Sequence, residues 1–113
     1  MPDTIYLEWG RIEFSKNEVS LISTVEDPPK VRLAAAAGLS LGAATFNRLR
    51  PDGVQEELIL IQGKQDERTR GDPTNLAGEI TIHINDGRGL GDASMVKVME
   101  IRHDSVWIKG ING

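Results

Sequence analysis

The chain contains no cysteine, which excludes a disulfide scaffold, a thiolate nucleophile and a cysteine zinc site. Aromatic residues make up only 4% of the sequence, so a core must be built from aliphatic side chains. An excess of positive charge is also missing. The net charge is −4 and the pI is about 5.1, which argues against a protein that follows nucleic-acid phosphates. We therefore expect no nucleic-acid partner.

Long apolar runs are absent as well. No stretch approaches the ~20 apolar residues that a membrane-spanning helix needs, and residues 1–8 lack the basic start and apolar run of a signal peptide. We expect a protein made in the cytoplasm without membrane insertion. The 113 residues are enough for one domain, or for one domain with an extended arm.

The strongest pattern in the sequence is a glycine-punctuated meander in residues 78–110. Isoleucines alternate with polar residues over residues 79–85, which is the period of a half-buried strand. The segment 86–92 (DGRGLGD) interrupts this strand because its glycines favour a loop. Two further extended runs follow, and the pair His103-Asp104 between them predicts a tight turn, because both residue types tolerate left-handed conformations. We predict three antiparallel strands here.

The N-terminal part carries shorter signals of the same kind. Residues 4–9 and 11–14 are β-prone runs broken at Gly10, and residues 18–25 alternate again until Pro28-Pro29 stops them. Residues 31–49 (VRLAAAAGLSLGAATFNRL) are ambiguous. Four alanines favour a helix, whereas two glycines and a period of two in the leucines and alanines favour extended structure. We favour the extended form.

The middle of the chain predicts a turn, a strand and a loop. Residues 50–53 (RPDG) have the proline and glycine of a turn. In residues 57–63 (ELILIQG) apolar side chains alternate onto both faces, and such a strand must be covered on both. A partner subunit is the simplest explanation of how both faces of this strand are covered. Residues 64–77 are charged and polar, and we expect an exposed, mobile loop.

Several motifs of residues 54–110 resemble a pattern found in bacteriophage tail fibres and related virion-attached fibre proteins. They are Ile61-Gln62-Gly63, then Gly78-Glu79-Ile80-Thr81-Ile82, Met99-Glu100-Ile101 and Val106-Trp107-Ile108. Trp107 and Lys109 stand where such fibres usually carry glycine. The resemblance implies an interwoven homotrimer of the virion with a structural or host-attachment role and no catalysis. It implies other virion fibre or tail proteins, and a host-surface glycan, as partners.

Candidate receptor-binding residues lie in the exposed polar stretches and on the last strand. Arg70-Gly71-Asp72 spells a cell-adhesion tripeptide, but a turn is its ordinary interpretation. Trp107 faces away from Val106 and Ile108, so it is either a subunit-interface anchor or an exposed stacking residue. The residues proposed for receptor binding are Arg68, Arg70, Asp72, Arg88 and Trp107.

Catalytic and metal chemistry have fewer candidates. His83 and His103 are the only possible bases of a nucleophilic mechanism, and neither sits in a nucleophile motif. In a trimer, a residue near the axis occurs three times, so His83 or Asp86 could form a ring of three metal ligands. The glycines at 87, 89 and 91 do not have the spacing of a dinucleotide-binding loop.

These observations predict an all-β fold of short antiparallel strands in an intertwined homotrimeric, fibre-like assembly. Residues 1–50 would form an N-terminal β arm or shaft-like segment, and residues 51–113 a β-meander fibre domain. We expect a non-enzymatic virion protein without a cofactor. Two alternatives remain. One is a monomeric carbohydrate-binding module that uses Trp9 or Trp107. The other is a polysaccharide-degrading domain using the carboxylates Glu56, Glu57, Asp66 and Glu67.

Overall fold

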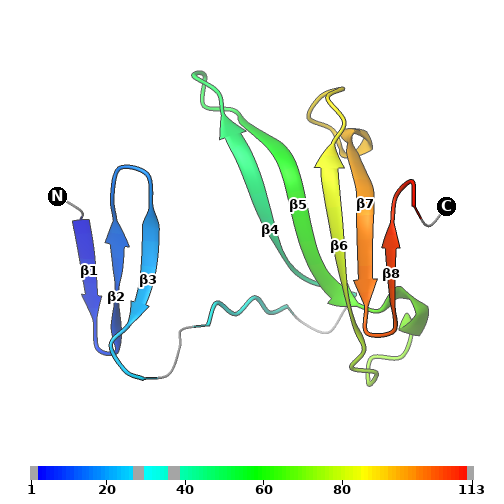
Figure 1. Cartoon of the computed structure of the whole chain (residues 1–113), viewed down its shortest axis with the longest axis horizontal. Coiled ribbons are helices and arrows are strands. Elements are labelled where there is room, and N and C mark those ends of the chain that lie inside the picture. The colour runs from blue at the N-terminus through cyan, green and yellow to red at the C-terminus, as the bar shows by residue number, and fades with distance from the viewer. Residues whose placement is uncertain (1–2, 27–29, 36–38, 112–113) are drawn as a thin grey trace. The chain divides into compact units, whose positions relative to one another are not determined.

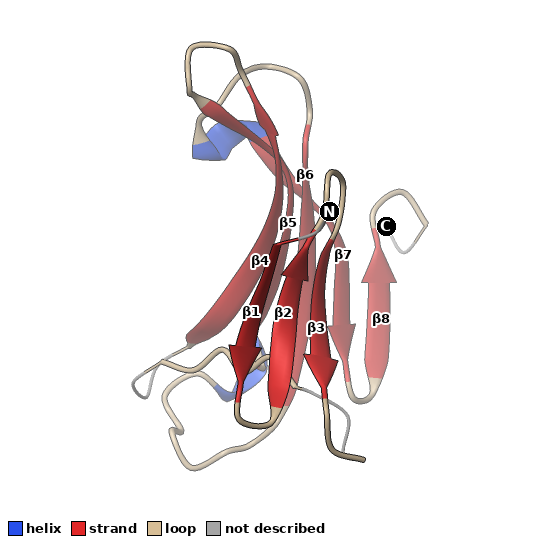
Figure 2. Ribbon diagram, turned by 90° about the vertical axis from the view of Figure 1, so that its left-hand side faces the viewer, coloured by secondary structure: helices blue, strands red, loops and turns tan. Residues whose placement is uncertain are grey.

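The computed structural model of the chain describes residues 3–26, 30–35 and 39–111. The described part is all-β, as the sequence predicts, and its strands form two antiparallel sheets. Figure 1 shows the strands in chain order and Figure 2 shows how little helix accompanies them. The expected stop at Pro28-Pro29 and part of the alanine run, residues 36–38, lie outside the described residues.

The first sheet has three strands in the order β1-β2-β3. They are β1 (Asp3–Leu7), β2 (Gly10–Phe14) and β3 (Val19–Ser23). The break between β1 and β2 falls at Glu8-Trp9, directly before the position predicted at Gly10. A side chain at Gly10 would meet the Ile22 carbonyl oxygen at 2.5 Å, so this position requires glycine because the neighbouring backbone is too close for a Cβ.

The second sheet has five strands in the order β4-β5-β6-β7-β8, so each strand pairs with its neighbour in the sequence. They are β4 (Ser40–Leu49), β5 (Gln55–Gln65), β6 (Gly78–Asn85), β7 (Met95–Arg102) and β8 (Ser105–Ile108). The meander β6–β8 is confirmed. The extended form of residues 40–49 is also confirmed, because β4 pairs with β5 over nearly its whole length.

The turns of this sheet follow local chemistry. In the β4–β5 turn, the Gly53 N–H donates to the Arg50 carbonyl over 2.9 Å and Gly53 has φ +88°, as predicted from Pro51 and Gly53. The β7–β8 turn lies at His103-Asp104, since Arg102 pairs with Ser105. The reason given for that turn was wrong: no described residue other than glycine has a positive φ.

The chain divides into two compact units, residues 1–32 and 33–113. This boundary differs from the expected one at residue 50, because β4 forms a long hairpin with β5 and therefore belongs to the second unit. Residues 50–53 are the turn of that hairpin rather than a link between units.

Neither unit has a conventional apolar core in the described residues. No described hydrophobic side chain is fully buried, while the fully buried residues are polar: Asp66, Glu79, Thr81 and Ser94. Each unit is a single layer of strands, and the two helical turns, Glu67–Thr69 and Asp92–Ser94, are only three residues long. Such a layer lacks the second layer against which a sheet usually buries its apolar face.

Candidate functional site

One face of the five-stranded sheet is apolar from edge to edge. The strand register places Ile61 opposite Ile82, Ile82 opposite Met99, and Met99 opposite Ile108, and directly opposed residues share a face. Phe46 on this face is 57% exposed. We call it the apolar face. It consists of Ala44, Phe46, Ile59, Ile61, Ile80, Ile82, Ile84, Val96, Met99, Ile101, Val106 and Ile108.

Leu33 lies over one end of the apolar face. Gly42 and Gly63 pair directly there, and a Cβ built on Gly42 would be 2.6 Å from the Leu33 Cβ. The glycine pair leaves a hollow of about 300 Å³, which is lined mainly by Leu33, Leu41, Ala44, Ile61 and Ile80. Leu33 itself remains 58% exposed, so this single contact does not cover the face. A contiguous exposed apolar surface of this kind is typical of a protein interface.

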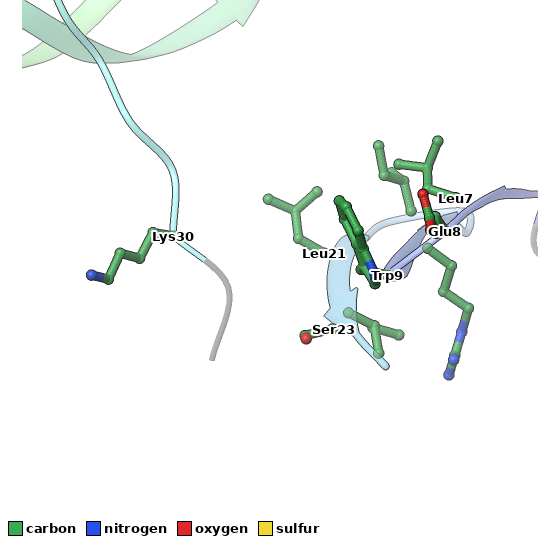
Figure 3. Close-up of a pocket in the computed structure, with 10 residues that line it drawn as sticks. Leu7, Glu8, Trp9, Leu21, Ser23 and Lys30 are labelled. Carbon is green, nitrogen blue, oxygen red and sulfur yellow. The ribbon is translucent and has the colours of Figure 1, made fainter. Parts of the chain in front are cut away.

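The three-stranded sheet also has one apolar face. Ile5, Ile12 and Leu21 are cross-strand partners and share a face. At one end of the sheet, Trp9 is 68% exposed and borders an open hollow of about 560 Å³. In Figure 3 the Trp9 ring stands between Leu21 and the neighbouring Leu7 and Glu8. An exposed tryptophan beside an apolar hollow suits either a protein partner or the face of a sugar ring.

The opposite, polar face of the five-stranded sheet is held by ion pairs. Glu79 is buried on β6, and its Oε1 accepts a hydrogen bond of 2.6 Å from Arg102 Nε of the paired strand β7. Lys64 Nζ lies 3.3 Å from Glu79 Oε2. Burial alone raises the pKa of Glu79, but hydrogen bonds from Arg102, the Glu67 N–H and Lys64 outweigh burial and lower that pKa below its ordinary value.

A second group of ion pairs joins the segment after β5 to the β7–β8 turn. Asp66 is only 1% exposed, and Arg68 Nη2 donates to its Oδ2 over 2.6 Å. The same guanidinium reaches Asp104 at 2.9 Å. The hydrogen bonds from Arg68 hold the pKa of Asp66 well below its usual range. Residues 70–76 are exposed, as the sequence predicts. The prediction was wrong for residues 64–66, because the first two belong to β5 and the buried Asp66 carboxylate ties the following turn to the sheet.

The predicted receptor residues lie at two ends of the sheet. Arg68, Arg70 and Asp72 belong to the segment before β6, whereas Arg88 belongs to the loop after it. Arg70 pairs with Glu67, and Asp72 Oδ1 accepts from Thr74 Oγ1 over 2.6 Å. Arg88 pairs with Asp86 and donates to the Ala93 carbonyl. The structure does not bring these residues together, and each already has a local partner.

Trp107 lies on the polar face. It is opposite Glu100 in the register, and the Lys97 ammonium is 5.2 Å from the centre of its ring, a distance at which a cation–π contact operates. Because Val106 and Ile108 point to the apolar face, Trp107 is separated from that surface by the sheet itself. This position favours the stacking interpretation of Trp107 over the interface interpretation for contacts made through the apolar face.

The metal candidates His83 and Asp86 do not form a site within one chain. Among the residues the structure describes, no group of three or more His, Asp or Glu could hold a metal ion. His83 lies on the polar face, and burial together with Lys97 and Lys64 lowers its pKa. Asp86 is occupied by Arg88 at 2.5 Å. A ring of three His83 residues needs three chains and stays a prediction.

Three of the four carboxylates proposed for polysaccharide cleavage are paired with cations. Glu56 accepts from Arg48 Nε over 2.9 Å, Glu67 contacts Lys64 and Arg70, and Asp66 is paired with Arg68. A general acid needs a raised pKa, whereas the pKa of Asp66 is lowered. Asp66 is therefore unsuited to act as the general acid of that reaction.

The ion-pair network was not found by sequence reasoning. Glu79 and Arg102 become neighbours only through the β6–β7 register, which shifts at Ile82/His83. A perfect period-two extrapolation cannot anticipate such a bulge. One sequence feature could have indicated the Glu79–Arg102 pair. The predicted turn at His103-Asp104 sets the end of β7, and in an antiparallel hairpin that end lies beside the start of β6.

The fold and surfaces define an all-β protein built from two one-sided antiparallel sheets. None of the described helices has the length and apolar character needed to cross a membrane. Comparisons of the chain with protein-family models, with curated proteins and with solved structures found no match.

Proposed function

We propose that this protein is a non-enzymatic structural protein of a virion, a component of a homotrimeric tail fibre or head fibre that serves assembly or attachment to a host surface. The sequence motifs of residues 54–110 and the apolar face of the five-stranded sheet support this proposal. Its partners are two further copies of the chain and other fibre or tail proteins, and a host-surface glycan is its candidate receptor.

The uncovered apolar face is the observation that carries the proposal. Apolar surface removed from water contributes about 25 cal/mol per Å², and a face formed by residues from all five strands of the sheet is a large source of such stabilisation. Within the described residues nothing buries it fully. Association of identical faces around an axis provides the missing second layer without another gene product.

The polar face suits the outside of such an assembly. Its charged residues pair within the chain, as the Glu79–Arg102 and Lys64–Glu79 contacts show. A surface whose ionic groups are internally satisfied needs no partner for stability. Three outward faces then present each exposed group three times, and effective concentration raises the avidity of weak individual contacts.

The Trp9 hollow favours a second candidate, a carbohydrate-binding module. Trp9 is highly exposed, and Glu8 and Arg11 line the same hollow, so a stacking ring and hydrogen-bonding groups occur together. This candidate predicts a monomer whose tryptophan fluorescence is quenched when a sugar is titrated. The trimeric fibre component predicts an oligomer whatever the sugar.

The absolute mass in solution tests the proposed function. We expect light scattering coupled to size exclusion to give three times the 12.4 kDa of one chain. Ile61→Lys places a charge on the apolar face and should reduce the mass to that of one chain, because a lysine ammonium is not buried without a partner.

Gln62→Lys is the matched control for Ile61→Lys. Gln62 is the next residue of β5, lies on the polar face and hydrogen-bonds Ser40 at 2.8 Å. This variant should keep the trimeric mass. A wild-type mass of one chain, or a trimeric Ile61→Lys variant with an intact β-sheet circular dichroism spectrum, would contradict assembly through the apolar face.

A further inference from the structure

A hollow with both charged and apolar lining residues lies where two loops meet at one end of the five-stranded sheet. The β4–β5 turn and the β6–β7 loop both border it, and Figure 1 shows them at the same end of the strands. Its volume is about 300 Å³, near the lower limit for small-ligand sites. The lining residues are Arg48, Arg50, Glu56, Leu58, Asn85, Gly87, Gly89 and Leu90.

The lining carries two arginines, and each is paired with one carboxylate. Arg48 uses Nε for Glu56 at 2.9 Å, and Arg50 uses Nη2 for Asp52 at 2.5 Å. A guanidinium has five N–H donors. Within the described residues, the remaining donors of these two side chains have no partner that would compete with a ligand.

The two loops that border the hollow are held in place by hydrogen bonds. Asn85 Nδ2 donates to the carbonyls of Glu57 at 3.1 Å and Gly89 at 2.8 Å, which fastens the β6–β7 loop to β5. The Arg50 N–H donates to the Val54 carbonyl over 2.9 Å across the β4–β5 turn. A preorganised site loses less conformational entropy when a ligand binds.

We propose that this hollow binds a carboxylate-bearing sugar, such as a uronic acid unit of a surface polysaccharide. The arginine pair holds the carboxylate, because planar guanidinium groups match carboxylate geometry. Leu58 and Leu90 offer an apolar floor to the carbon face of the ring, and the Glu56 carboxylate accepts hydrogen bonds from ring hydroxyls. The choice of a sugar rests on the proposed function in host attachment, whereas the choice of an anion rests on the two arginines.

Titration of the 113-residue chain with sodium glucuronate, followed by amide chemical shifts, tests the proposal. We expect saturable shifts confined to the β4–β5 turn and the β6–β7 loop, and no such shifts with glucose. Inorganic phosphate should bind more weakly than glucuronate, because it makes no contact with the leucine floor. Arg48→Gln and Arg50→Gln should each weaken glucuronate binding by about tenfold or more, since each removes charge-assisted hydrogen bonds.

Arg32→Gln is the matched control. Arg32 is an exposed arginine that lines neither this hollow nor the Trp9 hollow. Its glucuronate affinity should equal that of the wild type. Absence of saturable shifts, or equal affinity in Arg48→Gln and Arg50→Gln, would overturn the site. Phosphate binding as tightly as glucuronate would overturn the sugar. None of these outcomes changes the solution mass, so failure here is distinguishable from failure of the trimer.

Discussion

The two faces of the five-stranded sheet differ in how their side chains are shielded from water. On the polar face, long side chains of adjacent strands cover one another, and Thr81 is only 2% exposed although no second layer lies above it. On the apolar face, Ile80 and Ile84 on the same strand are each 43% exposed. Long charged side chains can lie across a sheet and pair with one another. Short branched aliphatic side chains are buried only when another layer of protein packs against them. The charged groups of the polar face are therefore paired within one chain, whereas the apolar face stays uncovered in the described residues.

Removal of Arg102 should give the largest loss of stability among single changes on the polar face. Its guanidinium contacts Glu79 at 2.6 Å, Glu100 at 3.3 Å and Asp66 at 3.4 Å. Arg102→Met would remove the shortest ion pair of the buried Glu79, which then keeps only Lys64 at 3.3 Å, and we expect the free energy of unfolding to fall by about 2–3 kcal/mol. Urea denaturation at one fixed protein concentration measures it.

Arg11→Met is the control for this measurement. The Arg11–Glu13 pair is partly exposed in the three-stranded sheet, and such pairs contribute less than about 1 kcal/mol. Equal losses in the two variants would show that the polar face of the larger sheet is no better organised than an ordinary exposed surface.

Acid should weaken the polar face in a defined direction. The pKa of Glu79 is lowered in the folded protein from its ordinary value of 4.5. Its stabilising contribution is therefore complete above about pH 4.5 and is lost as the pH falls through the lowered pKa. We expect the midpoint of urea unfolding to decrease between about pH 5 and pH 3.

Glu79→Gln should flatten that dependence, because the substituted side chain has no proton to gain. The variant should be less stable than the wild type at neutral pH and lose less of its stability on acidification. An unchanged slope would assign the acid sensitivity to other carboxylates, with Asp66 first among them because its pKa is also lowered.

The smallest expected effect distinguishes two glycines on the apolar face. Gly42→Ala places a methyl group 2.6 Å from the Leu33 Cβ, so Leu33 must move, and we expect a loss of about 1 kcal/mol. Gly63→Ala meets nothing closer than 3.8 Å and should change stability by less than about 0.5 kcal/mol. The Leu33 methyl resonances should shift only in the Gly42 variant. A shift in both, or in neither, would place Leu33 elsewhere.

The local elements and the antiparallel pairing of the last three strands could be predicted from the sequence, whereas the exact register and the burial of charged side chains could not. Alternation of Ile80, Ile82 and Ile84 predicted strand β6, and Pro51 with Gly53 predicted the turn between β4 and β5. These signals act through neighbouring residues and survive in any context. The burial of Asp66 was missed because residues 64–77 are mostly polar, and a polar composition predicts that a segment is exposed to solvent.

The amino-acid sequence by itself determined that this chain forms short antiparallel strands with an aliphatic surface, since period-two patterning and turn residues specify both. Tertiary structure alone decided which charges are buried. A register shift at Ile82/His83 places Glu79 opposite Arg102, and a three-residue helical turn directs Arg68 toward Asp66. The register of a strand pair depends on the sum of many weak contacts, so no short stretch of sequence encodes it.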